Sequence, residues 1–292
     1  MAEIIPQSRF AEGIGMFGLY LPVANAIGPA FGLWVAQAES FNKLFIVSVI
    51  VGMISLILLG SVGLLRSKDQ KLEKTSAKAP EKTVAIDNNR LPKTFLGTEF
   101  GVVFPCVVLM MMYFGYSAIV SFVALYATKQ DIDGIGLFFS ISAISLFIAR
   151  YIFAKLVKKC GYHKFVMASL LLFSIVLLLI PHLKSILTLY IMAVFYGAAL
   201  GVVPMAVNAQ VLERCSVQRR GTAMAAYTAS MDIGIGLGSL VVGFILDHSG
   251  YILAFSFAGA VCFVSVVIYA LTVARDHDGY IEKMNRINRI NH

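Results

Sequence analysis

Charged side chains are scarce in this chain: Asp, Glu, Lys and Arg make up 14% of the residues, against 59% hydrophobic ones. A soluble domain carries roughly 25% charged residues, so an ordinary water-soluble fold is excluded. The mean hydropathy of +0.82 agrees with this exclusion. The sequence predicts an integral membrane protein whose surroundings are a lipid bilayer.

Catalytic and metal-binding patterns are also missing. There is no glycine-rich phosphate loop with its Lys, and no H-E-x-x-H or G-x-S-x-G motif. The four cysteines lack metal-site or disulfide spacing, and the five histidines are scattered over loops and the tail. We therefore expect no enzyme, no cofactor and no bound metal.

What the chain has instead is long apolar stretches, each able to cross a hydrocarbon core of about 30 Å as a helix. Eight such spans can be drawn: 13–36, 42–65, 99–127, 134–157, 165–182, 185–210, 220–247 and 250–274. A Lys-rich polar segment, 66–98, separates the second span from the third and reads as a flexible linker. The predicted fold is an all-α polytopic membrane protein with a tail at 275–292.

The distribution of basic residues predicts the orientation. Loops on the side of the two termini hold 20 of the 24 Lys and Arg residues, and the opposite loops hold three. The positive-inside rule places the side with the excess in the cytoplasm. We therefore predict that both termini and the linker are cytoplasmic, in a cell membrane. The net charge of +8 is then a topology signal, and nucleic-acid binding is not expected.

An internal repeat links the two ends of the chain. The stretch from Arg219 to Asp247 matches the stretch from Arg9 to Gln37 at an offset of 210 positions, with Arg, an aromatic start and a small-residue helix in the same order. Within the later copy, Gly234 and Gly238 have the four-residue spacing at which two membrane helices approach closely. The sequence thus reads as two related halves, the first of them cut short.

Two spans, a basic cytoplasmic linker and six further spans, with the first two repeating the last two, resemble the major facilitator superfamily. Its members have two six-helix halves related by an axis along the membrane normal. The resemblance implies that spans 13–36 and 42–65 correspond to helices five and six, and the last six spans to helices seven to twelve. Helices one to four have no counterpart. The resemblance therefore implies a truncated transporter that needs a missing N-terminal helical segment or self-association.

A motif in the first span supports this resemblance. Gly15, Ala24, Gly28, Pro29 and Gly32 resemble the helix-five motif of drug–proton antiporters, although the family pattern has Gly where Ala24 stands. Pro bends a helix by removing a backbone donor, and flanking small residues let a neighbour pack against the bend. In the family the motif is associated with exporters. The alternative is that Gly and Pro are simply common in membrane helices.

A second, weaker motif follows the fourth span. Leu156, Lys159 and Gly161 match the loop signature G-x-L-x-D-R-x-G-R of the superfamily, with Lys159 in place of Arg. Lys158 stands where the family has Asp, so an acid-based latch between the halves is in doubt. A basic helix end followed by Gly is also ordinary C-cap chemistry.

Asp232 and Arg150 are the charged residues that lie well away from the ends of the spans. A carboxylate facing lipid near mid-bilayer costs at least ~2.5–3.5 kcal/mol, so Asp232 should face a cavity or a partner, and a proton-coupling role suits it. A structural polar pair is the alternative. Arg150 can snorkel to the cytoplasmic surface or serve a gating or substrate role.

Uncharged polar residues in the spans are the other candidates for a translocation path. They are Asn25, Tyr113, Tyr116, Asn208 and Gln210. Each could equally be an interface anchor or an interhelical bond. Taken with the resemblance, the sequence predicts a secondary transporter that exports small organic molecules in exchange for protons. A facilitator or importer on the same fold, and a non-transporting remnant, are the alternatives.

Overall fold

The computed structural model describes residues 28, 31–32, 45–58, 94–95, 98–132, 134–160, 162–216 and 219–273. Its contacts divide the chain into two units, residues 28–89 and the remainder, which are treated separately. In the first unit a helix runs from Phe45 to Leu58, within the second predicted span. Most of the span 13–36 and of the linker 66–98 lies outside the described residues.

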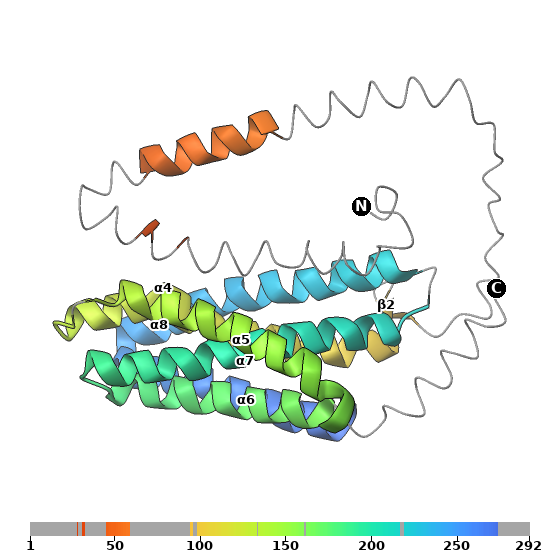
Figure 1. Cartoon of the computed structure of the whole chain (residues 1–292). Helices are drawn as coiled ribbons and strands as arrows, with labels where there is room; N and C mark the ends of the chain where they lie inside the picture. Colours follow the sequence, from red (N-terminus) through yellow and green to blue (C-terminus); the bar gives the residue numbers. More distant parts are fainter. Residues whose placement is uncertain are drawn as a thin grey trace. The chain divides into compact units, whose positions relative to one another are not determined.

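The larger unit is a bundle of long helices (Figure 1). Its elements are β1 (Thr94–Phe95), β2 (Thr98–Glu99), α4 (Phe100–Lys129), α5 (Gly136–Cys160), α6 (Tyr162–Leu179), η3 (Ile180–His182), α7 (Ile186–Glu213), α8 (Arg220–Ile268) and the π-helical turn η5 (Tyr269–Val273). The two short strands pair antiparallel just before α4. The all-α membrane fold is thereby confirmed, with helix ends within a few residues of the predicted spans.

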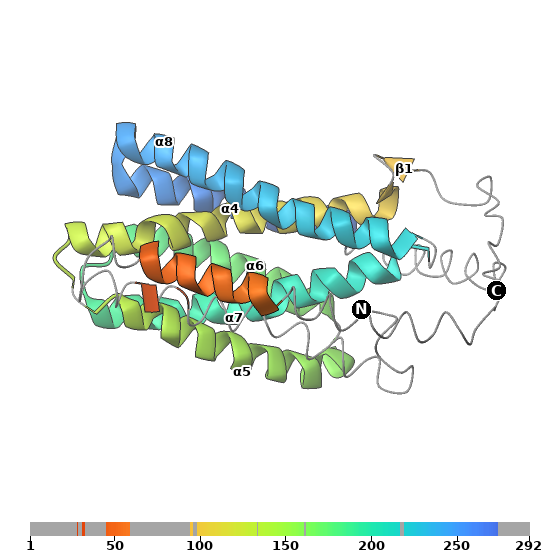
Figure 2. The ribbon, with the colours of Figure 1, turned by 90° about the horizontal axis from the view of Figure 1, so that it is seen from above.

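The helix α8 supplies two spans. Its 49 residues would extend about 74 Å at 1.5 Å per residue, more than twice the thickness of a bilayer core. The helix is interrupted at Gly250, whose φ of 81° and ψ of 177° are not helical. Glycine tolerates this positive φ because it has no Cβ. The first arm, 220–249, and the second arm, 251–268, fold back on each other there (Figure 2), where the sequence predicts the break between its last two spans.

Successive spans run antiparallel. The ring of Phe153 near the end of α5 meets that of Phe165 near the start of α6, 5.6 Å between centroids. Alternate helices are therefore parallel. The most extensive packing is that of α4 with the two arms of α8 and that of α5 with α7. Within the described residues, five stretches are long and apolar enough to cross a membrane: α4, α5, α6 with η3, α7, and the folded α8 with η5.

Glycines allow both close pairings. In the α4–α8 pair, a Cβ at Gly234 would overlap the carbonyl oxygen of Met110, and one at Gly238 would overlap the hydroxyl of Ser117. In the α5–α7 pair, a Cβ at Gly197 would overlap the carbonyl oxygen of Ser142. These backbones approach too closely for any side chain to lie between them, as in other small-residue membrane contacts.

Polar networks secure the two ends of the bundle. At the end holding the α8 turn, the Tyr126 hydroxyl donates to the carbonyl oxygen of Leu183, at 2.8 Å. At the basic end, Gln210 Nε2 donates to the Tyr269 hydroxyl at 2.6 Å, and His163 Nδ1 lies 2.8 Å from the same oxygen. Arg214 Nη2 also donates to the carbonyl oxygen of Val273, at 2.7 Å. The last helix is thereby tied to α6 and α7.

Candidate translocation face

Polar side chains from four helices gather at membrane depth. Two tyrosines of α4, Tyr113 and Tyr116, are 7% and 9% exposed, and their ring centroids lie 5.3 Å apart. Tyr196 of α7 is 2% exposed and stacks on Tyr116 at 6.4 Å. The rings of Phe138 and Phe173 stack on Tyr196 in turn, at 5.8 and 5.6 Å. The three tyrosines therefore form a ladder anchored in the aromatic core.

The three side chains of this ladder are largely buried. Each is at least nine-tenths buried. No side-chain hydrogen bond among the described residues involves the hydroxyls of Tyr113, Tyr116 or Tyr196.

Arg150 connects this ladder to a fourth tyrosine. It is half-buried on α5, and its charge lies within electrostatic range of Tyr113 and Tyr227. Tyr227, on the first arm of α8, donates a hydrogen bond to the carbonyl oxygen of Pro204 on α7.

Asp232 lies on the first arm of α8 and is exposed on the described bundle. It is twelve residues from Arg220, the start of the helix, which is about 18 Å at 1.5 Å per residue. It lies within electrostatic range of Tyr113 on α4. A carboxylate at this depth is costly against lipid, so this exposed face of α8 is expected to meet water or protein.

The structure thus brings together Tyr113 and Tyr116, and it places Arg150 and Asp232 within electrostatic range of Tyr113. Asn208 is nearby, half-buried on α7, with Nδ2 3.9 Å from the sulfur of Met224. Gln210 is absent from this group, because it belongs to the network at the basic end.

The motif residues are placed less completely. Asn25, Gly15, Pro29 and Gly161 lie outside the described residues, as does the side chain of Lys159. Gly28 and Gly32 are helical within the smaller unit, and Leu156 is 39% exposed near the end of α5. The helix-five motif and the loop motif therefore stay predictions.

Sequence reasoning missed several residues of this region. Tyr196 and Tyr227 carry no local signal, because a tyrosine in an apolar helix gives no indication of which neighbour its ring will meet. Gly197 and Gly201 do carry a signal: they have the same four-residue spacing as Gly234 and Gly238. That spacing predicts a close helix approach, and the α5–α7 contact is the result.

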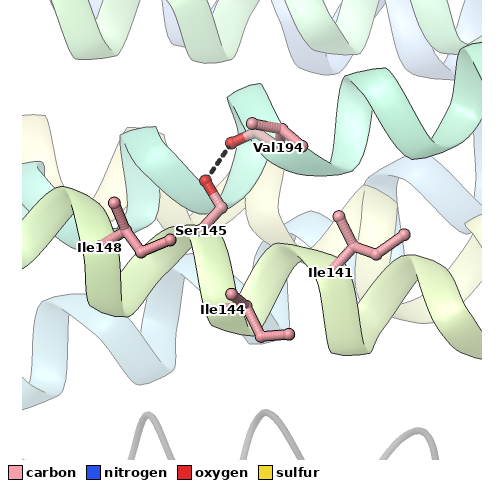
Figure 3. A pocket seen from close by; sticks show the side chains of 5 residues that line it. All are labelled: Ile141, Ile144, Ser145, Ile148 and Val194. Carbon is pink, nitrogen blue, oxygen red and sulfur yellow. Dashed lines mark hydrogen bonds between the residues drawn. The ribbon is translucent and has the colours of Figure 1, made fainter.

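A groove of about 310 Å³ opens between α5 and α7 (Figure 3). Its lining is Ile141, Ile144, Ser145, Ile148 and Val194. The one polar side chain, Ser145, already donates to the Val194 carbonyl oxygen at 2.6 Å. Binding sites for polar small molecules need several converging polar groups, which this groove lacks. None of the tyrosines or charged residues above lines it, so it is separate from the candidate translocation face.

Comparison with known proteins decides the family. The sequence model of the Major Facilitator Superfamily matches this chain over residues 1–134 and again over residues 105–283. The chain belongs to the major facilitator superfamily. Its long apolar helices are those of a family of membrane transporters, and this membership points to transport in place of enzymatic catalysis.

Two relatives extend the comparison. The staphylopine export protein of Staphylococcus aureus is 22% identical over 277 residues, which cover 91% of this chain and 66% of the relative. An uncharacterized MFS-type transporter of Methanocaldococcus jannaschii is 20% identical over 284 residues, 94% of this chain and 69% of the relative. This major facilitator chain therefore spans about two thirds of the length of the curated relatives it matches.

Proposed function

We propose that this protein is a secondary transporter that exports small organic molecules across the cell membrane in exchange for protons. Its termini and linker lie in the cytoplasm, in accord with the distribution of basic residues. Family membership supports transport, and the name of one relative, an export protein, supports the outward direction. The helix-five motif that includes Gly28 and Pro29 is a further argument for export.

The observation that carries the proposal is the candidate translocation face. It joins a cation on α5, hydroxyls on α4, α7 and α8, and a carboxylate on α8, all inside spans that are otherwise apolar. Ionisable residues at such depth face a bundle interior or a water-filled path, and they mark ion and substrate routes. In alternating access, such a face lies at the bilayer midplane and opens to one side at a time.

Asp232 is the proton carrier in this proposal. Its carboxylate is exposed where a second helical segment or water must cover it, and it acts on Tyr113 within the ladder. Protonation neutralises the carboxylate and removes the cost of facing a low-dielectric surface. Alternation of protonated and ionised Asp232 would then couple proton entry to substrate exit.

The test is transport by inverted membrane vesicles containing the full chain, energised by an imposed pH gradient. Two dyes serve as probes: rhodamine 6G, which is cationic, and carboxyfluorescein, which is anionic. We expect at least one dye to accumulate in the vesicles when the pH gradient is imposed. In Asp232→Asn, the rate of accumulation should fall to that of vesicles without the chain. Asp247→Asn is the matched control, because Asp247 is exposed on the same arm beside the α8 turn.

The other outcomes separate the alternatives. If the rate of dye movement were the same without the pH gradient and in Asp232→Asn, the chain would be a facilitator or importer, and proton coupling would be contradicted. Absence of any movement, with insertion shown by protease protection, would reject autonomous transport and favour a non-transporting remnant or a chain that needs a partner.

A further inference from the structure

We propose that the groove between α5 and α7 binds one acyl chain of an anionic phospholipid, with the ammonium group of Lys155 at the lipid headgroup. The groove is the one lined by Ile141, Ile144, Ser145, Ile148 and Val194 (Figure 3). This inference goes beyond the proposed transport activity, because it needs only a chain that lies in a membrane. It does not involve the candidate translocation face.

The first argument is the chemistry of the lining. Four of the five lining side chains are branched aliphatic ones. The hydroxyl of Ser145 already donates to the carbonyl oxygen of Val194, at 2.6 Å. The groove therefore offers contacts to an apolar ligand and little to a polar one. Its volume of about 310 Å³ is at the lower end of the range for ligand pockets, about 300–1,000 Å³, which suits a segment of one acyl chain.

The second argument favours an acyl chain over another transmembrane helix. Helices dock closely in membranes where small residues let two backbones approach, as Gly197 does against Ser142 in this bundle. The lining of the groove has three isoleucines and a valine, and it has no glycine or alanine. Such side chains hold a docking backbone away, whereas a flexible hydrocarbon chain can follow an irregular apolar surface.

The third argument is the position of Lys155 on α5. Ile148, Tyr151 and Lys155 follow one another at spacings of three and four residues, which place side chains on one face of a helix. Lys155 comes ten residues after Ser145, about 15 Å along the axis at 1.5 Å per residue. This distance is half of a hydrocarbon core of about 30 Å, which is the reach of the acyl chains of one leaflet. A lipid whose headgroup contacts Lys155 can therefore place an acyl chain in the groove.

The fourth argument is charge. The ammonium of Lys155 lies 4.2 Å from the centroid of the Tyr151 ring, and both side chains are exposed. In the part of the chain that the structure describes, no carboxylate pairs with this ammonium. Lysine and tyrosine are common at the level of lipid headgroups. Two further lysines, Lys158 and Lys159, follow in the last turn of α5. The excess of positive charge favours an anionic headgroup over a zwitterionic one.

The experiment measures the thermal stabilisation of the purified full chain in detergent by added phospholipid. The probes are phosphatidylglycerol and phosphatidylcholine with the same two acyl chains, so that they differ only in the headgroup. A ligand that binds the folded state raises Tm with its concentration, which gives an apparent Kd. We expect phosphatidylglycerol to raise Tm at concentrations at which phosphatidylcholine leaves it unchanged. Equal effects of the two lipids would overturn the proposal.

One pair of variants tests the headgroup contact. Lys155→Gln should weaken the binding of phosphatidylglycerol about fivefold, the effect of one lysine near a membrane surface. Lys129→Gln is the matched control, because the Lys129 ammonium also lies over a tyrosine ring, that of Tyr251, at the other end of the bundle. It should leave the apparent Kd unchanged. Equal weakening in both variants, or none in Lys155→Gln, would mean non-specific attraction to basic side chains and would overturn the site.

A second pair of variants tests the groove. Ile144→Trp should weaken the binding of phosphatidylglycerol, because the larger side chain occupies part of the groove. Ile144 is 61% exposed, so its replacement should leave the core intact. Leu240→Trp is the control, because Leu240 is 72% exposed on the first arm of α8 and does not line the groove. If Ile144→Trp bound phosphatidylglycerol as wild type does, the acyl chain would not lie in the groove and the proposal would be overturned.

A second copy of the chain is the other occupant to test. Ile144→Cys, in a background with Cys160→Ser, leaves Cys106, Cys215 and Cys262 as buried native cysteines. After treatment of membranes with an oxidant, the lipid proposal predicts that this variant stays monomeric on a non-reducing gel. A disulfide-linked dimer would place a second copy on the groove and overturn the proposal. None of these measurements depends on transport, so the outcome of the dye test leaves them unaffected.

Discussion

The hydroxyl of Tyr227 on α8 donates a hydrogen bond to the main-chain carbonyl oxygen of Pro204 on α7, with 3.0 Å between the two oxygens. Pro204 lies inside α7 and lacks the N–H that would complete the helical bond four residues earlier. Tyr227 thus bonds to α7 at the residue that interrupts its helical hydrogen bonding. The same hydroxyl lies within electrostatic range of Arg150 on α5.

Tyr227→Phe should therefore destabilise the bundle by about 1 kcal/mol, the net contribution of one buried hydrogen bond. The ring and its packing are kept, so the change isolates the hydroxyl. Thermal unfolding can be followed with a thiol-reactive dye, since Cys106, Cys215 and Cys262 are buried in the folded chain. Tyr251→Phe is the control, because it keeps the ring that Lys129 covers at 5.3 Å. Equal midpoint temperatures of unfolding for the two variants would show that the hydrogen bond to Pro204 contributes nothing to stability.

Gly197→Ala should destabilise the bundle more than the addition of one methyl group usually does. The added methyl would meet the carbonyl oxygen of Ser142, which belongs to the α5 backbone and cannot rotate away. Separating the two helices should cost about 1–3 kcal/mol, as other overpacking substitutions do. Gly236→Ala is the matched control, since its Cβ would meet no atom within 4 Å.

Gly236→Ala should be neutral or slightly stabilising, because Ala favours helix over Gly by about 0.8–1.0 kcal/mol. The comparison needs only the midpoint temperatures of the two variants in the same detergent. If Gly197→Ala had the same midpoint temperature of unfolding as wild type, the backbone contact between α5 and α7 would be contradicted.

Tyr269→Phe should loosen the attachment of the last helix. Gln210 is fully buried, and its amide would lose the hydroxyl that accepts its hydrogen bond at 2.6 Å. Leaving one buried donor without a partner costs about 1–3 kcal/mol. In the double variant Gln210→Met/Tyr269→Phe the loss should be smaller than the sum of the two single losses, because both remove the same bond. Strict additivity would mean that the two side chains do not interact.

The predicted orientation can be tested with single cysteines. His248→Cys, at the α8 turn, should react with a membrane-impermeant maleimide in intact cells, whereas Arg220→Cys should react only after permeabilisation. Both positions are exposed, and they lie at opposite ends of the first arm of α8. The background should carry Cys160→Ser, so that the remaining native cysteines are the buried ones. If only Arg220→Cys were labelled in intact cells, the orientation of the chain in the membrane would be opposite to the predicted one.

Much of this protein could be predicted from its sequence, because the relevant free energies are local. Transfer of a residue into hydrocarbon depends on its own side chain, so hydropathy alone located the spans matched by α4 to α8 and the break at Gly250. Likewise Asp232 and Arg150 stood out because each is costly within its own span, whatever its neighbours. The all-α membrane class followed from the same reasoning.

Only the tertiary structure decided which of these residues meet. Arg150, Tyr113 and Tyr227 belong to three helices, and their grouping depends on helix rotation and on which pairs approach most closely. Those choices follow from glycines such as Gly197 and Gly234, whose partners on α5 and α4 no local pattern identifies. Lipid is as apolar as a leucine side chain, so hydropathy alone does not distinguish a helix face that packs on protein from one that faces the bilayer. Close packing and polar pairing make that distinction, and both exist only once the helices are assembled.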